Sequence, residues 1–198
     1  MKKFSAVLCG IFAASFIFAE VQQFNVHYEP VTASSSFDVA FIQYDCMKET
    51  SVRRTGGVPV AQAFTAENGL YEERFTLFED TGSSSATRKM EYLSVVMEYA
   101  AMAAGRKLPV SAFKAFEDKD IAEGFNGDFG HTCFVTEPNS TYAGKYDYMM
   151  IDFFCKAGQG IVMRTILTND ASIFTEPTDD FVFVYHSFSF FDNQELFW

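Results

Sequence analysis

Residues 58–78, VPVAQAFTAENGLYEERFTLF, contain the strongest structural signal in the chain, because two apolar arms flank Asn68-Gly69. Because Asn-Gly accepts positive φ at both central turn positions, the dipeptide predicts a β-hairpin with arms at 58–67 and 70–78. Apolar and polar side chains alternate between the two faces of the second arm. This alternation predicts a sheet with one face in the core and the other largely in water.

Further strands are predicted on both sides of this hairpin. Residues 37–46 carry apolar side chains on both alternating faces, which is typical of an interior strand. Later in the chain, three apolar and partly β-branched runs are separated by loops and predict a meander at 129–136, 145–155 and 161–168.

A helix is predicted directly after the hairpin. The serines at 83–85 offer N-caps, and Gly105 offers a C-terminal stop. An apolar stripe at helical spacing would pack on the sheet, although it would also suit a partner-binding groove. The stripe contains Met90, Leu93, Met97, Ala101 and Ala104, widened by Val96 and Ala100. A second, short helix is predicted after Pro109-Val110, with Ser111 as its N-cap and with Phe113 and Phe116 buried.

The C-terminal region fits two structures. Residues 181–191 match both a helix face and an alternating strand, but Asp179 and Asp180 favour a helix over 178–187. A short extended segment follows at 187–190. The order strand, hairpin, helices, meander and final helix predicts one α+β domain over 37–198, with a mostly antiparallel sheet packed against helices.

The layout and the ending HSFSF, His186 to Phe190, resemble the PsbP-like family across residues 37–191. The resemblance implies an α/β/α sandwich, with an antiparallel sheet between helical layers. It also implies a non-catalytic binding or assembly role, such as the plant members have at photosystem II. It carries over no functional residue, and nothing in the sequence indicates a photosynthetic role.

The first 19 residues have the pattern of a secretory signal peptide. Lys2 and Lys3 precede a nearly uninterrupted apolar run that ends at the small residue Ala19. The run is shorter than the about 20 apolar residues that a membrane-spanning helix needs. We therefore expect a periplasmic or extracellular protein without stable membrane insertion. Residues 20–36 are a mixed N-terminal segment, and lipidation at Cys9 is disfavoured because Leu8 precedes it.

The charge balance limits the class of partner. The formal net charge is −11 and the isoelectric point is near 4.6, which argues against nucleic acid. Aromatic residues are concentrated at the C-terminus, in Phe188 to Trp198. If exposed, they would form an apolar patch for a protein partner; the alternative is that they pack against their own domain.

Two modifications could affect an exported chain. Three cysteines follow the signal peptide, Cys46, Cys133 and Cys155, so at most one disulfide can form within the chain. We expect buried thiols, because a core of this size needs no covalent cross-link. Asn139-Ser140-Thr141 is a glycosylation sequon, which matters only in a eukaryotic secretory pathway.

The sequence contains one motif that suggests nucleophilic catalysis. Ser111-Ala112-Phe113-Lys114 matches Ser-x-x-Lys, and a helix start there would place the Lys114 amine one turn from the Ser111 hydroxyl. The other elements of penicillin-recognising enzymes are missing, and so is the Gly-x-Ser-x-Gly elbow of lipases. We therefore predict a helix cap and a solvent-exposed lysine, with no catalytic residue.

Metal and nucleotide motifs are incomplete. His131 and Cys133 share a strand face, but zinc needs three or four ligands, and only Cys155 or His186 could complete the set in space. His27 is remote in sequence. Residues 118–124 lack the order of an EF-hand loop, and Asp128-Phe129-Gly130 lacks the other kinase elements. We predict no metal site and no cofactor.

The sequence thus favours an exported, non-catalytic binding or assembly domain with a protein partner. Two alternatives stay open. One is a small-ligand carrier with a pocket between the sheet and the helix that carries Met90 and Met97. The other is an exported hydrolase that uses Ser111 and Lys114.

Overall fold

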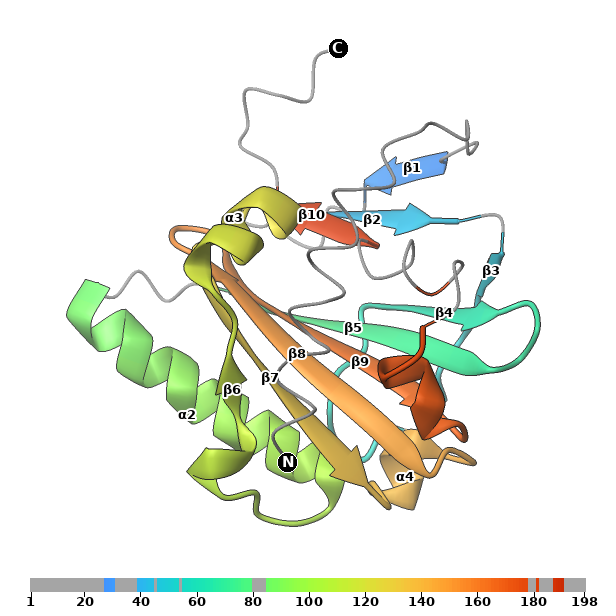
Figure 1. The fold of residues 1–198 in the computed structure, drawn as a ribbon. Helices are drawn as coiled ribbons and strands as arrows, with labels where there is room; N and C mark the ends of the chain where they lie inside the picture. The colour runs from blue at the N-terminus through green and yellow to red at the C-terminus, as the bar shows by residue number, and fades with distance from the viewer. Residues whose placement is uncertain are drawn as a thin grey trace.

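A seven-stranded antiparallel sheet forms the centre of the molecule, in the order β3-β4-β5-β9-β8-β7-β6 (Figure 1). The computed structural model describes residues 27–30, 39–44, 46–53, 55–79, 85–177, 181 and 187–190. The strands are β3 (Met47–Glu49), β4 (Gln62–Ala66), β5 (Tyr71–Glu79), β6 (Lys114–Ala115), β7 (Phe129–Thr136), β8 (Tyr148–Lys156) and β9 (Gly160–Thr168). The predicted hairpin is β4–β5 and the predicted meander is β7–β8–β9, so the α+β class with a mostly antiparallel sheet is confirmed.

A second, three-stranded sheet joins the two ends of the described chain. It contains β1 (His27–Pro30), β2 (Val39–Gln43) and β10 (Phe188–Phe190), in the order β1-β2-β10. β2 pairs on both edges, as the pattern of residues 37–46 predicted. β1 lies within the mixed segment 20–36.

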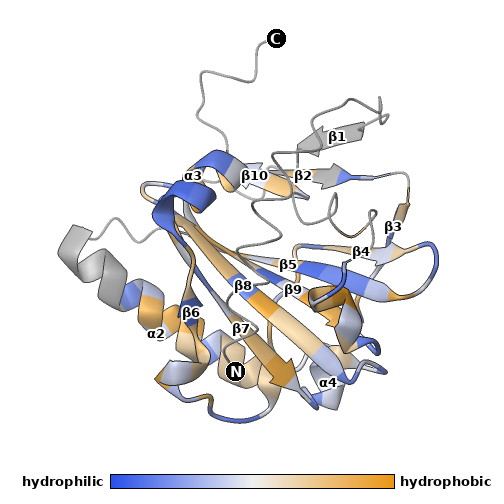
Figure 2. Cartoon of the chain, viewed as in Figure 1, coloured by the Kyte–Doolittle hydropathy of each residue, from blue (hydrophilic) through white to orange (hydrophobic). Residues whose placement is uncertain are grey.

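Different elements cover the two faces of the large sheet (Figure 1). The helices α2 (Ser85–Ala104) and α4 (Ser140–Ala143) pack on one face. The small sheet and α3 (Asp118–Phe125) pack on the other, where Phe41, Phe125 and Phe188 contribute to a single aromatic core. The α/β/α sandwich implied by the resemblance is thus modified, because the small sheet shares the second layer with a helix. Figure 2 shows β8 and β9 as apolar along most of their length, which fits strands that are covered on both sides.

The prediction that β5 has one face in water was wrong. Arg74 and Thr76, on the expected wet face, are buried, because α4 and the loop at Pro59 cover them. Their side chains donate hydrogen bonds to the backbone carbonyls of Tyr142 and Pro59. The hairpin turn also differs from the expected two-residue form. Of the two turn residues Asn68 and Gly69, only Gly69 has a positive φ. The Gly69 N–H donates to the Ala66 carbonyl at 2.8 Å, and the loop between the two strands is longer than two residues.

Helix α2 ends where the sequence predicted. Gly105 has a φ of +70°, its N–H donates to the Met102 carbonyl, and the Arg106 N–H donates to the Ala101 carbonyl, both at 3.2 Å. These are the two bonds of a Schellman motif, which favours glycine at this position. A Cβ atom at Gly105 would also lie only 3.0 Å from Cβ of Asn139.

The buried face of α2 is rotated from the predicted stripe. The residues that pack on the sheet are Tyr92, Val96, Ala100, Ala103 and Ala104. Leu93 is 41% exposed, and Met97 and Ala101 are half-buried, so these members of the stripe are on the flank of the helix. The predicted stripe was based on leucine and methionine. In the fold, small alanines let the helix lie close to the sheet, and Tyr92 is buried there because its hydroxyl has hydrogen-bond partners. The Met90 side chain lies outside the described residues.

The predicted second helix was wrong in position. Val110–Ala112 form only the 3₁₀ turn η1, and Lys114 and Ala115 then pair with β7 as β6. The helix α3 begins at Asp118, and Asp118 and Asp120 in its first turn stabilise the positive end of the helix dipole. The helix is capped at its C-terminus by Asn126, which has a left-handed backbone conformation. Phe116 is buried and Phe113 is half-buried.

The extended segment predicted at 187–190 is confirmed by β10, whereas of the helix predicted over 178–187 only Phe181 and Ser187 belong to the described residues. Phe181 is helical, and residues 188–190 form β10. The signal-peptide prediction for residues 1–19 and the segments 182–186 and 191–198 lie outside the described residues. Within the described part of the chain, no helix has the length and apolarity to cross a membrane.

Candidate functional site

The structure does not support the helical geometry of the Ser-x-x-Lys motif. Ser111 is exposed in η1, whose N-cap is Pro109, and Lys114 is exposed on the edge strand β6. The prediction of Ser111 as a helix cap was therefore wrong. The two residues lie on different elements, so the helical turn that would have brought amine and hydroxyl together is absent.

His131 has a structural partner that the sequence did not reveal. Its Nδ1 lies 3.1 Å from the hydroxyl of Tyr92, which also donates to the Phe153 carbonyl at 3.3 Å. Burial raises the pKa of the neighbouring Cys133 thiol to about 12, so this thiol is protonated. No group of three or more potential metal ligands gathers among the residues that the structure describes. The His27 side chain and His186 are outside that set.

The cysteines are not joined by disulfides, and the sequon asparagine has a structural role. Cys46, Cys133 and Cys155 are thiols, and no disulfide joins any two of them. Asn139 caps α4: its side-chain oxygen accepts the Thr141 N–H at 3.0 Å, and its Nδ2 donates to the Met102 carbonyl at 3.2 Å. The amide that glycosylation would modify therefore already joins the end of α2 to the start of α4.

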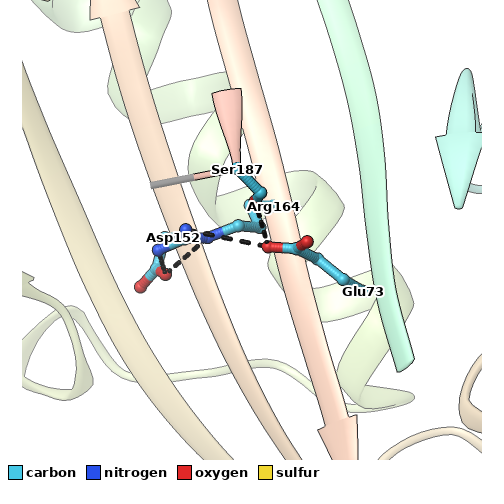
Figure 3. A network of polar contacts seen from close by, with 4 residues as sticks. All are labelled: Glu73, Asp152, Arg164 and Ser187. Atoms are coloured by element: carbon cyan, nitrogen blue, oxygen red, sulfur yellow. Dashed lines mark hydrogen bonds and ion pairs between the residues drawn. The ribbon is translucent and has the colours of Figure 1, made fainter. Parts of the chain in front are cut away.

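A buried cluster of charges lies between the two sheets (Figure 3). Arg164 on β9 is placed between Asp152 on β8 and Glu73 on β5, and none of the three is exposed. Its guanidinium donates to Asp152 Oδ2 at 2.7 and 3.2 Å and lies 3.7 Å from Glu73 Oε1. The hydroxyl of Ser187 donates to Glu73 Oε1 at 2.7 Å.

The surroundings of this cluster are apolar. The Arg164 guanidinium lies over the rings of Phe125 and Phe154, with 5.6 and 5.3 Å to the centroids. Burial raises the pKa of Glu73 to about 7, although Arg164 and Ser187 act in the opposite direction. Because the cluster is fully enclosed, it acts as an internal contact that connects Ser187, directly before β10, to the large sheet.

The sequence contains a signal for this cluster that was missed. Asp152 and Arg164 are the charged residues in the interior of two otherwise apolar strand runs, and they are direct partners in the β8–β9 ladder. When one acid and one base lie within adjacent buried strands, they are expected to form an ion pair, because an unpaired buried charge costs much free energy of folding. Glu73 and Ser187 could not have been added without the tertiary structure.

A groove lies on the outer flank of α2. We define the α2 groove, an open depression of about 590 Å³, by its lining residues: Met97, Glu98, Ala101, Met102, Gly105, Arg106 and Lys107. Leu93 continues the same face one turn earlier, at the same four-residue spacing as Met97, Ala101 and Gly105. The ligand-carrier hypothesis placed its pocket between this helix and the sheet. That interface is filled by the buried residues of α2, and the groove that Met97 lines is on the solvent side.

The aromatic C-terminus does not form a partner surface where it is described. Phe188 and Phe190 are 0% exposed and belong to the core between the two sheets. The hypothesis of a partner that binds through the aromatic C-terminus is therefore wrong for these two residues. Residues 191–198 are outside the described set.

Comparison with known proteins gives one result about the fold. No protein-family model and no curated protein matches the chain. The structure is similar to the solution structure of cyanobacterial PsbP from Synechocystis, with a TM-score of 0.45 and 10% sequence identity. The similarity covers 87% of this chain and 96% of the Synechocystis chain. At this level of similarity the match assigns neither a family nor a residue role to this chain.

Proposed function

We propose that the protein is an exported, non-catalytic binding domain that docks a protein partner on the outer flank of α2. The observation that carries the proposal is the exposure of apolar side chains beside a groove. Leu93 is 41% exposed, and Met97, Ala101 and Met102 are half-buried. Contiguous apolar surface that a domain leaves uncovered is typical of an interaction site.

The positions of the reactive groups support binding over catalysis. The titratable cluster around Arg164 is closed to solvent, the Cys133 thiol is buried, and His131 pairs with Tyr92. Ser111 and Lys114 are exposed on separate elements. Enzymes instead bring such groups together in an accessible pocket.

Site-specific photo-crosslinking tests this function in producing cells. A photoreactive residue is placed at Leu93 or Met97, and controls carry it at Val110 or Lys119. Val110 is the matched control, because it is 69% exposed and apolar but lies outside the groove. We expect a discrete crosslinked protein from the α2 positions in the exported fraction and none from the controls. Equal crosslinking from all four positions, or none from Leu93 and Met97, would contradict the proposal.

A further inference from the structure

We propose that the α2 groove takes an acidic, amphipathic peptide segment of the partner. The apolar side chains of that segment would lie on Met97, Ala101 and Met102, and its carboxylates would pair with Arg106 and Lys107. This inference rests on the proposed function, since it names the chemistry of the partner that the same surface would hold.

The shape of the groove favours a linear peptide over a small molecule. All its lining residues come from α2 and the three residues that follow it, so the groove is open along its length. Small-molecule sites usually enclose most of the surface of their ligand, which one helix flank cannot do. From Leu93 to Gly105 the flank spans about 18 Å at about 1.5 Å per residue, a length that suits apolar anchors at helical spacing.

The side chains of the groove floor favour an apolar partner face. Met97 and Met102 are unbranched and flexible, and methionines of this kind adapt to different apolar side chains. Met102 Cε lies 3.0 Å from the position that a Cβ atom at Gly57 would occupy, so the loop at Gly57 supports this side of the floor. Ala101 between the two methionines leaves space for a larger partner side chain.

The charges at one end of the groove favour a partner segment that carries negative charge. The chain carries a net charge of −11, yet two cations, Arg106 and Lys107, line the groove, and Glu98 is the one acid among its lining residues. Arg106 is held in place because its Nη1 and Nη2 donate to the carbonyls of Glu137 and Thr136, at 2.9 and 2.7 Å. Lys107 is exposed and makes no ion pair with the rest of the described chain. A carboxylate on the partner would complement both cations.

The experiment uses the protein without its signal peptide and two labelled helical peptides of about 18 residues, which have the same leucine face at helical spacing. One peptide carries glutamate on its polar face and the other carries lysine. Binding is measured by fluorescence anisotropy with the unmodified protein, Lys107→Glu, Lys107→Arg and Ala101→Gln. Lys119→Glu on α3 is the matched control, because it changes the net charge equally at an exposed site outside the groove.

We expect the glutamate peptide to bind more tightly than the lysine peptide. Lys107→Glu is expected to lower the affinity for the glutamate peptide by about tenfold, as for the loss of one good charge pair. Lys107→Arg is expected to preserve that affinity. Ala101→Gln should lower the affinity for both peptides, whereas Lys119→Glu should leave both affinities unchanged. Tighter binding of the lysine peptide, or equal effects of Lys107→Glu and Lys119→Glu, would overturn the inference. The crosslinks at Leu93 and Met97 would still decide the proposed function in that case.

Discussion

Arg164 and Asp152 face each other across adjacent strands, with Arg164 Nη2 and Asp152 Oδ2 2.7 Å apart and neither residue exposed. This pair fixes the register of β8 against β9. A shift of one residue would move the guanidinium to the opposite face of the sheet, into the apolar layer under α2. The contact therefore favours this pairing of the two central strands, because a shift of one residue would separate the two buried charges.

Asp152→Asn is expected to destabilise the protein by about 3–5 kcal/mol, as is typical when one partner of a buried ion pair is removed. The substitution would remove the carboxylate nearest to the Arg164 guanidinium, whereas Glu73 Oε1 lies farther away, at 3.7 Å. The free energy of unfolding is measured by urea titration. Asp147→Asn is the control, because this carboxylate is exposed and should have little effect. Equal stability of the two variants would show that the pair adds nothing to the fold.

Glu73 should make stability depend on pH. Its pKa is raised from 4.5 to about 7 in the fold, so the native state binds more protons than the unfolded state between these values. Stability is therefore expected to fall as the pH rises from about 4.5 to about 7, by up to about 3 kcal/mol. Glu73→Gln should remove this slope in urea titrations made at several pH values. An unchanged slope in this variant would assign the dependence to another group.

Ser187→Ala should loosen the connection between β10 and the large sheet. The variant loses the hydroxyl that donates to Glu73 Oε1 at 2.7 Å, and the loss of a bond to a buried polar group costs about 1–3 kcal/mol. We expect faster amide hydrogen exchange in residues 188–190, with little change in β8 and β9. Ser189→Ala is the control, since this half-buried hydroxyl makes longer contacts, at 3.1 and 3.4 Å. Equal exchange in both variants would argue against a tether through Ser187.

Gly105→Ala separates backbone strain from steric contact when it is compared with Gly158→Ala. Both glycines have positive φ, +70° and +79°, and alanine there costs about 1–2 kcal/mol. Only at Gly105 does the added Cβ meet another group, Cβ of Asn139 at 3.0 Å, whereas nothing lies within 4 Å at Gly158. Gly105→Ala should therefore lower the melting temperature more than Gly158→Ala. The reverse order would mean that the α2–α4 contact is not as tight as described.

Local sequence patterns were sufficient to predict the elements that depend on neighbouring residues. Gly105 ends α2 because only local backbone geometry decides a Schellman motif, and the turns between apolar runs define the β7–β8–β9 meander. The hairpin at Asn68-Gly69 follows from the same local chemistry. The second helix was misplaced because a 3₁₀ turn and a two-residue edge strand at 110–115 have no strong pattern of their own.

Which residues are buried, and which surface is left uncovered, depends on long-range packing that the sequence pattern does not reveal. Glu73 and Arg164 are buried on different strands, and their burial depends on their contact with each other and on contacts with Asp152 on β8 and with Ser187. The rotation of α2, which leaves Leu93 and Met97 on its flank, likewise depends on how closely Tyr92 and the alanines approach the sheet. Hydrophobic periodicity measures the polarity of a helix face but not the distance at which that face packs. For this reason the α2 groove, on which the proposed function rests, emerged from the fold.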